Sequence, residues 1–326
     1  MHEPPADLTE ADLAVALLRH WQLDVPDVRY APVGYGGYHW IGHDPSGGRW
    51  FVTASRVRSK ADLADLRAAM RAARDLAEAG LSFVVAPVAD AAADVVVPVR
   101  PDLALSVFPY IDGDPGHWGD PVSTHDRAAI TSMLAALHTT GRASATAPVR
   151  DPNPSSRAHL ETSLRERGRI WLGGGPFSEP ARALVTEHAA GLVAALAAFD
   201  DLRAQVRASA AGLVLTHGEL HPGNLIRRGA SYMLIDWDTA GLAPPERDLW
   251  WVLSDTGAEA ARYAELTGRE VSQAALALYR LRWDLDDIGL FLADFRAPHR
   301  RDQDSEKGLE GLVGALERVA SREKFS

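Results

Sequence analysis

Residues 214–238 read VLTHGELHPGNLIRRGASYMLIDWD, and this stretch decides the fold. Two short apolar runs, VLT and YMLI, flank a loop rich in His, Gly and Pro, which predicts two strands joined through tight turns. Polar side chains fall at the turns: Glu219 follows His-Gly, Asn224 comes five residues later, and Asp236 and Asp238 follow the second run. These two loops are therefore the first place to look for chemistry.

The composition describes an ordinary folded protein without thiol chemistry. The chain has 326 residues, a formal charge of −10 and no cysteine, so disulfides and thiolate metal sites are excluded. No apolar run approaches the roughly 18 residues that span a bilayer, and the acidic N-terminus lacks the basic region of a signal peptide, so we expect a cytoplasmic protein outside membranes. The negative charge disfavours nucleic acid and attracts cations such as an aminocyclitol, although solubility is the commoner reason for such acidity.

The order of the expected elements divides the chain in two. Short strand-like runs fill the first 110 residues or so, together with one helix that ends at Gly80, and the later pattern is mainly helical. We predict an α+β fold with an antiparallel, β-rich N-lobe at 1–110 and a largely helical C-lobe at 111–326; small ligands favour the cleft between such lobes. Expected strands lie at 28–33, 38–43, 49–54, 82–88, 94–99 and 103–113, expected helices at 61–79, 123–141, 178–210 and 271–295, and an expected mobile loop at 141–156.

Four segments together resemble the aminoglycoside phosphotransferase family, and most closely its spectinomycin phosphotransferase-like branch. They are GYGGYHW, SVFPYIDG, MLAALHTTG and THGELHPGNLI with the following YMLIDWDTAGLAPPERDLWWV, which in order and spacing cover about residues 33–253. The resemblance implies a bilobal, protein-kinase-like fold. It also implies transfer of a phosphoryl group from ATP or GTP, with Mg²⁺, to a hydroxyl of a small cationic natural product.

The resemblance assigns catalytic roles to the opening stretch. Glu219 lies where the family has the base that orients or deprotonates the acceptor hydroxyl, and Asn224 and Asp236 match its Mg²⁺ ligands. Mg²⁺ prefers such hard oxygen donors. Taken singly, Asn224 is better explained as a turn cap and Asp236 as a strand-end turn residue, but the constellation favours metal binding. His217 and Asp248 are expected to brace the loop rather than to react.

The nucleotide is expected to meet a glycine-rich loop and the connection between the lobes. Glycines let the backbone approach phosphates closely, although the same cluster is equally compatible with a hairpin turn. The connection FPYIDG is expected to present its backbone to the base. The candidate nucleotide-binding residues are Gly36, Gly37, Tyr38, Thr53, Pro109, Tyr110 and Ile111.

Two departures from the family pattern bear on activity. Glu219 replaces an aspartate, which keeps the basicity but extends the reach by about one bond length. Thr53 stands where the family has a lysine for the phosphates, and the helix at 61–79 has no glutamate to pair with it before Glu78. Both halves of that ion pair are therefore missing, as expected if the pair were replaced rather than damaged. Arg56, Arg58 and Lys60 are alternative cations, and the sequence selects none of them.

The candidate acceptor-binding residues are Asp238, Trp283, Asp284 and Asp287. The last three lie on the expected helix at 271–295, where the family supplies carboxylates for ammonium groups and aromatic rings for stacking. Asp284 and Asp287 are equally well explained as a solvated acidic face that pairs with Arg280 and Arg282.

Three functions remain open at this point. The first is the small-molecule phosphotransferase just described. The second is a binding protein that keeps the kinase fold without turnover, as the missing Lys–Glu pair suggests. The third is a kinase for a peptide serine or threonine, which nothing in the sequence selects.

Overall fold

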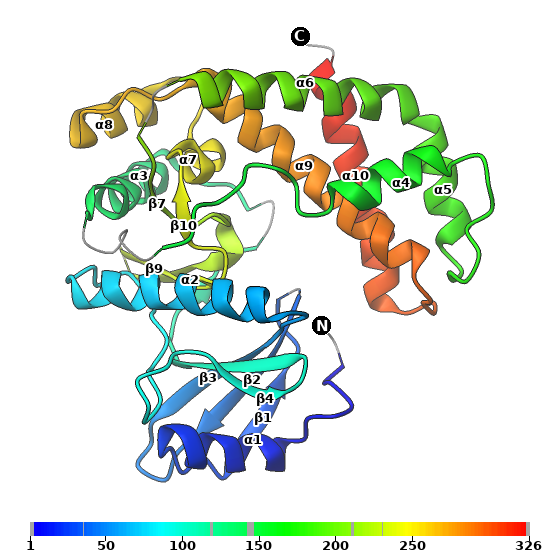
Figure 1. Ribbon diagram of the computed structural model, residues 1–326. Helices are drawn as coiled ribbons and strands as arrows, with labels where there is room; N and C mark the ends of the chain where they lie inside the picture. The colour runs from blue at the N-terminus through cyan, green and yellow to red at the C-terminus, as the bar shows by residue number, and fades with distance from the viewer. Residues whose placement is uncertain are drawn as a thin grey trace. The chain divides into compact units, whose positions relative to one another are not determined.

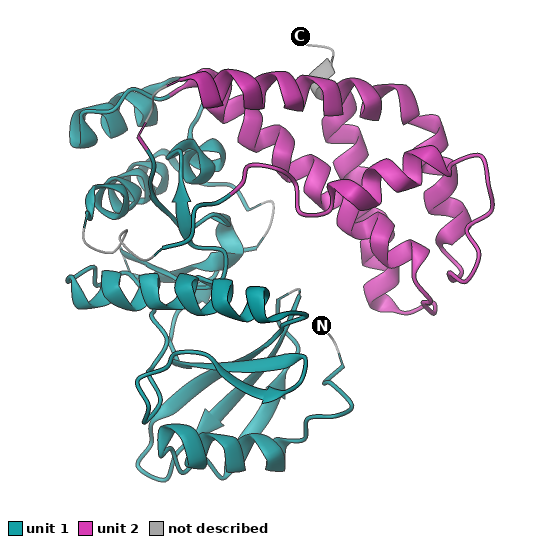
Figure 2. Cartoon of the chain, viewed as in Figure 1, with its two compact units in different colours: residues 1–150, 213–271 teal, residues 151–212, 272–326 magenta. Residues whose placement is uncertain are grey.

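The computed structural model describes residues 3–34, 36–117, 120–141, 147–209, 212–229 and 231–323 (Figure 1). The chain forms two compact units, residues 1–150 with 213–271 and residues 151–212 with 272–326 (Figure 2). This division differs from the lobe boundary expected after residue 110, which stays a prediction. The segment around the opening stretch returns to the first unit because its strands and loops pack there.

The first unit begins with the expected antiparallel sheet. Its five strands lie in the order β1-β2-β3-β5-β4, and every neighbouring pair is antiparallel. The expected strand at 82–88 is wrong: Val84 makes only an isolated bridge to Leu234, because the backbone of residues 83–85 bonds to the end of β9 and only Val88 bonds to β5, through the Val107 carbonyl. The strands are β1 Asp27–Ala31, β2 Gly37–His43, β3 Arg49–Arg56, β4 Val97–Arg100 and β5 Leu103–Pro109.

Alternation along these strands separates two faces of the sheet. Val52 and Ala54 of β3 are fully buried with Trp40 of β2 in an apolar core. Helix α1 (Glu10–Ala16) contributes Leu13 to the same core, and a capping box between Thr9 and Asp12 starts the helix. The residues between these, such as Thr53, point to the opposite face.

Helix α2 (Lys60–Glu78) confirms the helix expected at 61–79. The Ser59 side chain accepts a hydrogen bond from the backbone N–H of Asp62, which caps the first turn. Gly80 follows the helix with φ of +97°, a left-handed conformation that glycine adopts without a Cβ penalty. Both helix ends are therefore encoded locally.

The rest of the first unit places two loops at the same end of paired strands. Strand β7 pairs with β10, and β8 pairs with β9, all antiparallel. The loop after β7 and the loop after β9 therefore emerge next to each other. The elements are β6 Asp114–Pro115, α3 Thr124–Thr139, β7 Val214–Thr216, the 3₁₀ turn Pro222–Asn224, β8 Leu225–Arg228, β9 Ser231–Leu234, β10 Gly241–Ala243, α7 Glu246–Val252 and α8 Ala258–Thr267.

The second unit is a bundle of helices around one apolar core. Helix α9 (Gln273–Arg296) confirms the expected long helix, and Leu285, Ile288 and Leu292 are fully buried on its inner face. The single helix expected at 178–210 is instead two helices that meet at His188 with a bend of 70°. The other elements are α4 Arg157–Arg165, α5 Ser178–Glu187, α6 Ala189–Ala208 and α10 Gln303–Glu323.

No single helix among the described residues is long and apolar enough to cross a membrane, and only the bent pair of α5 and α6 passes that test when the two are joined.

The buried indole of Trp40 gives a direct test of the sheet core. We expect Trp40→Ala to destabilise the protein by about 3–5 kcal/mol, because it leaves a large cavity against β3 and α1. Val15→Ala on the outer face of α1, where the side chain is 67% exposed, should change stability by less than about 0.5 kcal/mol. Urea unfolding followed by circular dichroism measures both, and equal effects of the two variants would contradict the packing described.

Candidate active site

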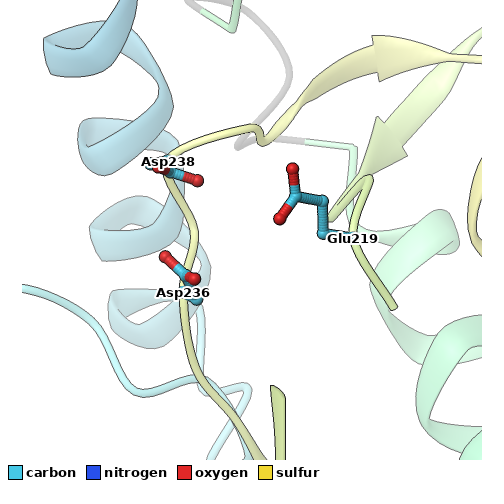
Figure 3. A group of neighbouring side chains, drawn as sticks. All are labelled: Glu219, Asp236 and Asp238. Atoms are coloured by element: carbon cyan, nitrogen blue, oxygen red, sulfur yellow. The ribbon is translucent and has the colours of Figure 1, made fainter. Parts of the chain in front are cut away.

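Three carboxylates meet where the two loops emerge. Glu219 lies on the loop after β7, and Asp236 and Asp238 lie on the loop after β9 (Figure 3). One oxygen from each of the three residues lies within 4.8 Å of the other two. Glu219 faces both aspartates from the opposite side of the gap (Figure 3). We call this group the acidic triad.

The Asp248 carboxylate holds the first loop in place. It lies in the first turn of α7, is fully buried, and accepts hydrogen bonds from the backbone N–H groups of His217 (2.8 Å) and Gly218 (2.7 Å). His138 Nε2 lies 3.1 Å from the same carboxylate. Burial raises the pKa of Asp248, but the hydrogen bond and charge of His138 and the nearby cations outweigh this, so the pKa is lowered. The expected bracing role of Asp248 is confirmed.

Arg247 of α7 also holds this loop in place. Its guanidinium donates to the Thr216 hydroxyl (2.9 Å) and to the Thr239 carbonyl (3.0 Å), so it connects the two loops. Gly218 lies directly over this guanidinium with φ of +98°, and a Cβ there would collide with it. The glycine of His-Gly-Glu is therefore required by a close approach as well as by its backbone conformation.

His217 acts as a brace, as expected, and not as a base. Its Nε2 lies 2.8 Å from the carbonyl oxygen of Ile235, and its Nδ1 accepts from the backbone N–H of Glu219 at 3.3 Å. Burial lowers the pKa of His217 to about 4, so the ring is neutral at pH 7. Both ring nitrogens are engaged in holding the loop after β7 against the loop after β9.

Asn224 fixes the far end of the catalytic loop. The side-chain amide of Asn224 donates to the Glu219 backbone carbonyl at 2.9 Å. The backbone carbonyl of Asn224 accepts a hydrogen bond from the Ile235 N–H at 3.0 Å. The residue is 6% exposed. With the amide nitrogen engaged in this way, the side-chain oxygen is the atom left for a metal ion.

The electrostatics of the acidic triad are those of a cation site. Asp236 has φ of +66°, an uncommon conformation that aims its carboxylate from the loop, and it remains open to solvent. Surrounding protein atoms raise the pKa values of Asp236 and Asp238, and the neighbouring carboxylates raise them further. The donors are all oxygens, which is the set that Mg²⁺ prefers, so these residues fit a magnesium ion.

Asp238 also lines a pocket of about 380 Å³ with β3 and α2. Ser55 and Arg56 of β3 and Leu66 of α2 are among its other walls. Sequence reasoning placed Asp238 with the acceptor-binding residues, and the structure brings its carboxylate to Glu219 and Asp236. Its role toward an acceptor stays a prediction.

Sequence reasoning missed an ion pair on α2. Asp65 pairs with Arg150 at 2.5 Å, and Arg150 also donates to the Ala240 carbonyl at 2.7 Å. Sequence reasoning considered only a glutamate on this helix and therefore not Asp65. Arg150 lies in the loop at 141–156 that was expected to be mobile. Of that segment, residues 142–146 lie outside the described chain, whereas Val149 and Arg150 are bonded to β10 and the loop before it.

The candidate nucleotide-binding residues lie at three places in the first unit. Gly36, with φ of +90°, precedes β2 and Gly37 is its first residue, while the Tyr38 side chain is buried in the sheet core and leaves only its main chain for a ligand. Thr53 lies on the face of β3 away from that core. At the end of β5, after Pro109, the Tyr110 N–H donates to the Arg49 carbonyl at 3.0 Å, so Ile111 offers the next backbone N–H.

Two of the candidate acceptor-binding residues of α9 pair with an arginine of α10, which the sequence analysis did not predict. Arg318 of α10 donates to Asp284 at 2.6 Å and to Asp287 at 3.0 Å. Asp284 is 1% exposed, whereas Asp287 stays partly open. Burial raises the pKa of Asp287 to about 7. Contact of Trp283, Asp284 and Asp287 with an acceptor stays a prediction.

The fold and the arrangement of the two loops define a kinase-like phosphotransferase. The phosphotransferase enzyme family model matches residues 28–303, and the chain belongs to this family. It is accordingly an enzyme that transfers a phosphoryl group to an alcohol group. The resemblance found in the sequence is confirmed, and so is the α+β kinase-like fold with an antiparallel sheet followed by a largely helical part. No curated protein matches the chain significantly.

Solved structures of related enzymes share the fold at low identity. A spectinomycin phosphotransferase, in complex with ADP and spectinomycin, matches with a TM-score of 0.76 and 16% identity, covering 97% of this chain and 99% of that chain. An aminoglycoside phosphotransferase from Alicyclobacillus acidocaldarius matches with a TM-score of 0.57 and 17% identity, covering 98% and 95%. An amicoumacin kinase matches with a TM-score of 0.60 and 16% identity, covering 97% and 94%.

Removing the charge that braces the catalytic loop should weaken the whole first unit. We expect Asp248→Asn to destabilise the protein by about 2–4 kcal/mol, because the amide NH2 that replaces one carboxylate oxygen would face the buried N–H of either His217 or Gly218 and leave it without an acceptor. Asp255→Asn, an exposed position just after α7, is the matched control and should change little. Thermal unfolding measures the difference, and equal stabilities would contradict the bracing role.

Neutralising one member of the acidic triad should stabilise the metal-free protein. We expect Asp236→Asn to raise Tm by about 1–3 °C without divalent ions, because repulsion falls and asparagine tolerates the left-handed backbone well. The variant should also lose the stabilisation that Mg²⁺ confers on the original protein by binding to the folded state. Unchanged stabilisation by Mg²⁺ in this variant, measured beside Asp255→Asn, would show that Asp236 is not a ligand.

Proposed function

We propose that this enzyme is an ATP- or GTP- and Mg²⁺-dependent O-phosphotransferase for a small cationic natural product of the aminoglycoside or aminocyclitol class. The observation that carries the proposal is the acidic triad, with Glu219 facing Asp236 and Asp238 on loops braced by Asp248 and His217. Phosphoryl transfer needs positioned oxygens and charge neutralisation more than covalent help. The acidic triad offers the oxygens directly and would bind the cation that supplies the neutralisation.

Asn224, Asp236 and Asp238 are the residues that would hold Mg²⁺. When bound, the ion neutralises phosphate charge and orients the phosphates for displacement. The side-chain oxygen of Asn224 and the carboxylates of the two aspartates are hard donors of the right type. Raised pKa values of Asp236 and Asp238 in the absence of a cation are the usual sign of carboxylates gathered for one.

Glu219 is the group we assign to the acceptor hydroxyl. In the proposed step the hydroxyl oxygen forms a bond to the γ-phosphorus, the bond from that phosphorus to the β–γ bridging oxygen breaks, and ADP or GDP leaves. The hydroxyl proton passes to a Glu219 carboxylate oxygen. The longer side chain of glutamate still brings its carboxylate within 4.8 Å of both aspartates, which supports a working base in place of the shorter one.

A cationic acceptor is supported by charge and by the related structures. The chain carries a formal charge of −10, which attracts cations. The related enzymes were solved with ADP and spectinomycin, and with AMP-PNP, Ca²⁺ and the amicoumacin ligand. We assign Trp283 and the partly exposed Asp287 to the acceptor, with Asp284 holding Arg318. We place the enzyme in the cytoplasm, acting on small molecules and not on nucleic acid or membranes.

One observation favours a second function, that of a binding protein without turnover. Thr53 stands where the family lysine is expected, and the α2 carboxylate Asp65 is paired with Arg150 instead. In that case the cleft would bind a nucleotide or an acceptor and release it unchanged. Turnover distinguishes the two functions.

The decisive test measures phosphoryl transfer and nucleotide binding together. We expect the protein with Mg²⁺, ATP or GTP, and spectinomycin or related aminocyclitols and aminoglycosides to release ADP or GDP and a phosphorylated acceptor. Glu219→Gln should lower kcat by about 10²–10⁴-fold with little change in nucleotide affinity, because it removes the proton acceptor alone. Glu265→Gln, an exposed glutamate on α8, is the matched control. Nucleotide binding without turnover for any acceptor, a serine or threonine peptide included, would establish the binding protein instead.

A further inference from the structure

Three polar side chains form a row across the middle of the N-terminal sheet. In the strand registers, His39 of β2 lies opposite Thr53 of β3, and Thr53 lies opposite Ser106 of β5. The side chains of paired residues point to the same face of a sheet. The row is unusual for this position, because the residues above and below it in the strands are apolar or small.

The row lies on the face of the sheet that leads to the acidic triad. Val52 and Ala54 point into the apolar core, so Thr53 and Ser55 point the other way. Ser55 lines the same pocket as Asp238. In this chain Thr53, with polar neighbours on both sides, occupies the position of the family's phosphate-binding lysine. Its side chain points to the face of the sheet that borders the pocket with Asp238.

His39 lies directly beneath the glycine-rich loop. A Cβ built on Gly34 would lie 3.2 Å from His39 Nε2, and one built on Gly37 would lie 3.2 Å from Cε1 of the same ring. Two further contacts hold the imidazole ring. It stacks on Phe51 at 5.2 Å between ring centroids, and its Nδ1 lies 3.1 Å from the Thr53 hydroxyl oxygen. The ring therefore has one orientation, with Nε2 toward the loop.

The chemistry of the ring suits a hydrogen-bond donor. Burial lowers the pKa of His39 to about 4, so the ring is neutral at pH 7 and carries one N–H. When the Thr53 hydroxyl donates to Nδ1, that N–H is on Nε2 and points at the loop. Ser106 adds to the polarity of the row: the residue is 1% exposed, and its hydroxyl has no hydrogen-bond partner among the described residues.

Two arginines of β3 are engaged elsewhere. Arg56 donates to the Tyr38 hydroxyl at 2.8 Å and to Asp102 at 3.0 Å. Arg49 pairs with Asp112 and lies over the Tyr110 ring. None of the three lysines of the sequence is on β2, β3 or β5. On the described strands β2, β3 and β5, the row formed by His39, Thr53 and Ser106 is the polar feature next to the glycine-rich loop.

We propose that His39 binds a phosphate oxygen of the nucleotide through Nε2, oriented by Thr53, and so replaces the lysine that the family places on β3. The inference rests on the proposed nucleotide-dependent function and names one of its binding residues. A neutral donor holds a phosphate oxygen by one hydrogen bond, which a glycine-rich loop above it complements. The missing lysine is in this way compensated from the neighbouring strand.

Calorimetric titration with Mg²⁺·ATP, Mg²⁺·ADP and adenosine tests this assignment. We expect His39→Ala to weaken binding of ATP and ADP by about 10- to 100-fold, the effect of losing a hydrogen bond to a charged group, and to leave adenosine within about twofold. Thr53→Val, which frees the ring, should weaken ATP binding by a smaller factor. His43→Ala, at the exposed end of the same strand, is the matched control and should bind all three ligands unchanged.

A second variant keeps the test decisive if His39→Ala folds poorly. Thr53→Lys in the His39→Ala background restores the family cation and should recover most of the lost ATP affinity; circular dichroism reports whether each variant is folded. Unchanged ATP affinity in a folded His39→Ala variant, or an equal loss for adenosine, would overturn the role of His39 while the proposed function stands. Failure of the original protein to bind any nucleotide would overturn both.

Discussion

The active-site arrangement depends on one buried carboxylate. Asp248 accepts the backbone N–H groups of His217 and Gly218 and faces His138, and all of these groups are removed from water. A buried ionised group is stable only when such partners surround it, so the loop after β7 has one permitted path. Glu219 follows directly on that path. The hydrogen bonds from the loop to Asp248 of α7 therefore set the position of Glu219, the proposed base.

The acidic triad lowers the stability of the folded protein, and contacts in the rest of the first unit offset this loss. Three carboxylates within 4.8 Å repel one another, and Asp236 holds an uncommon backbone conformation. The two loops stay in place because His217 bonds across to Ile235 and Arg247 bonds across to Thr239. A site prepared in this way for a cation is less stable without one, which is the common relation between stability and function.

The departures from the family pattern have a common consequence. Glu219 keeps a carboxylate at the catalytic loop, and Asp65 keeps a carboxylate on α2, but its partner is now Arg150. Arg150 also bonds to the Ala240 carbonyl, so the ion pair connects α2 to the loop that bears Asp236 and Asp238. The row at His39, Thr53 and Ser106 is the candidate we propose for a phosphate contact in place of the family's lysine.

Local sequence patterns predicted most elements and pointed to the two loops that carry the acidic triad. Caps at Thr9 and Ser59 and the glycine at Gly80 act over a few residues, and the helix expected at 61–79 is confirmed. The strand expected at 82–88 and the unbroken helix at 178–210 are wrong, because pairing with Leu234 and the bend at His188 depend on distant packing.

Only the tertiary structure decided which polar side chains meet. Asp65 and Arg150 are 85 residues apart, and Asp284 and Arg318 are 34 apart, so no local period relates them. The pairings β7–β10 and β8–β9 bring Asp238 to Glu219, and the register of β2, β3 and β5 aligns His39 with Thr53 and Ser106. The sequence by itself named the loops and their chemistry. The choice of partners required the fold, because charges and hydrogen bonds act through space and not along the chain.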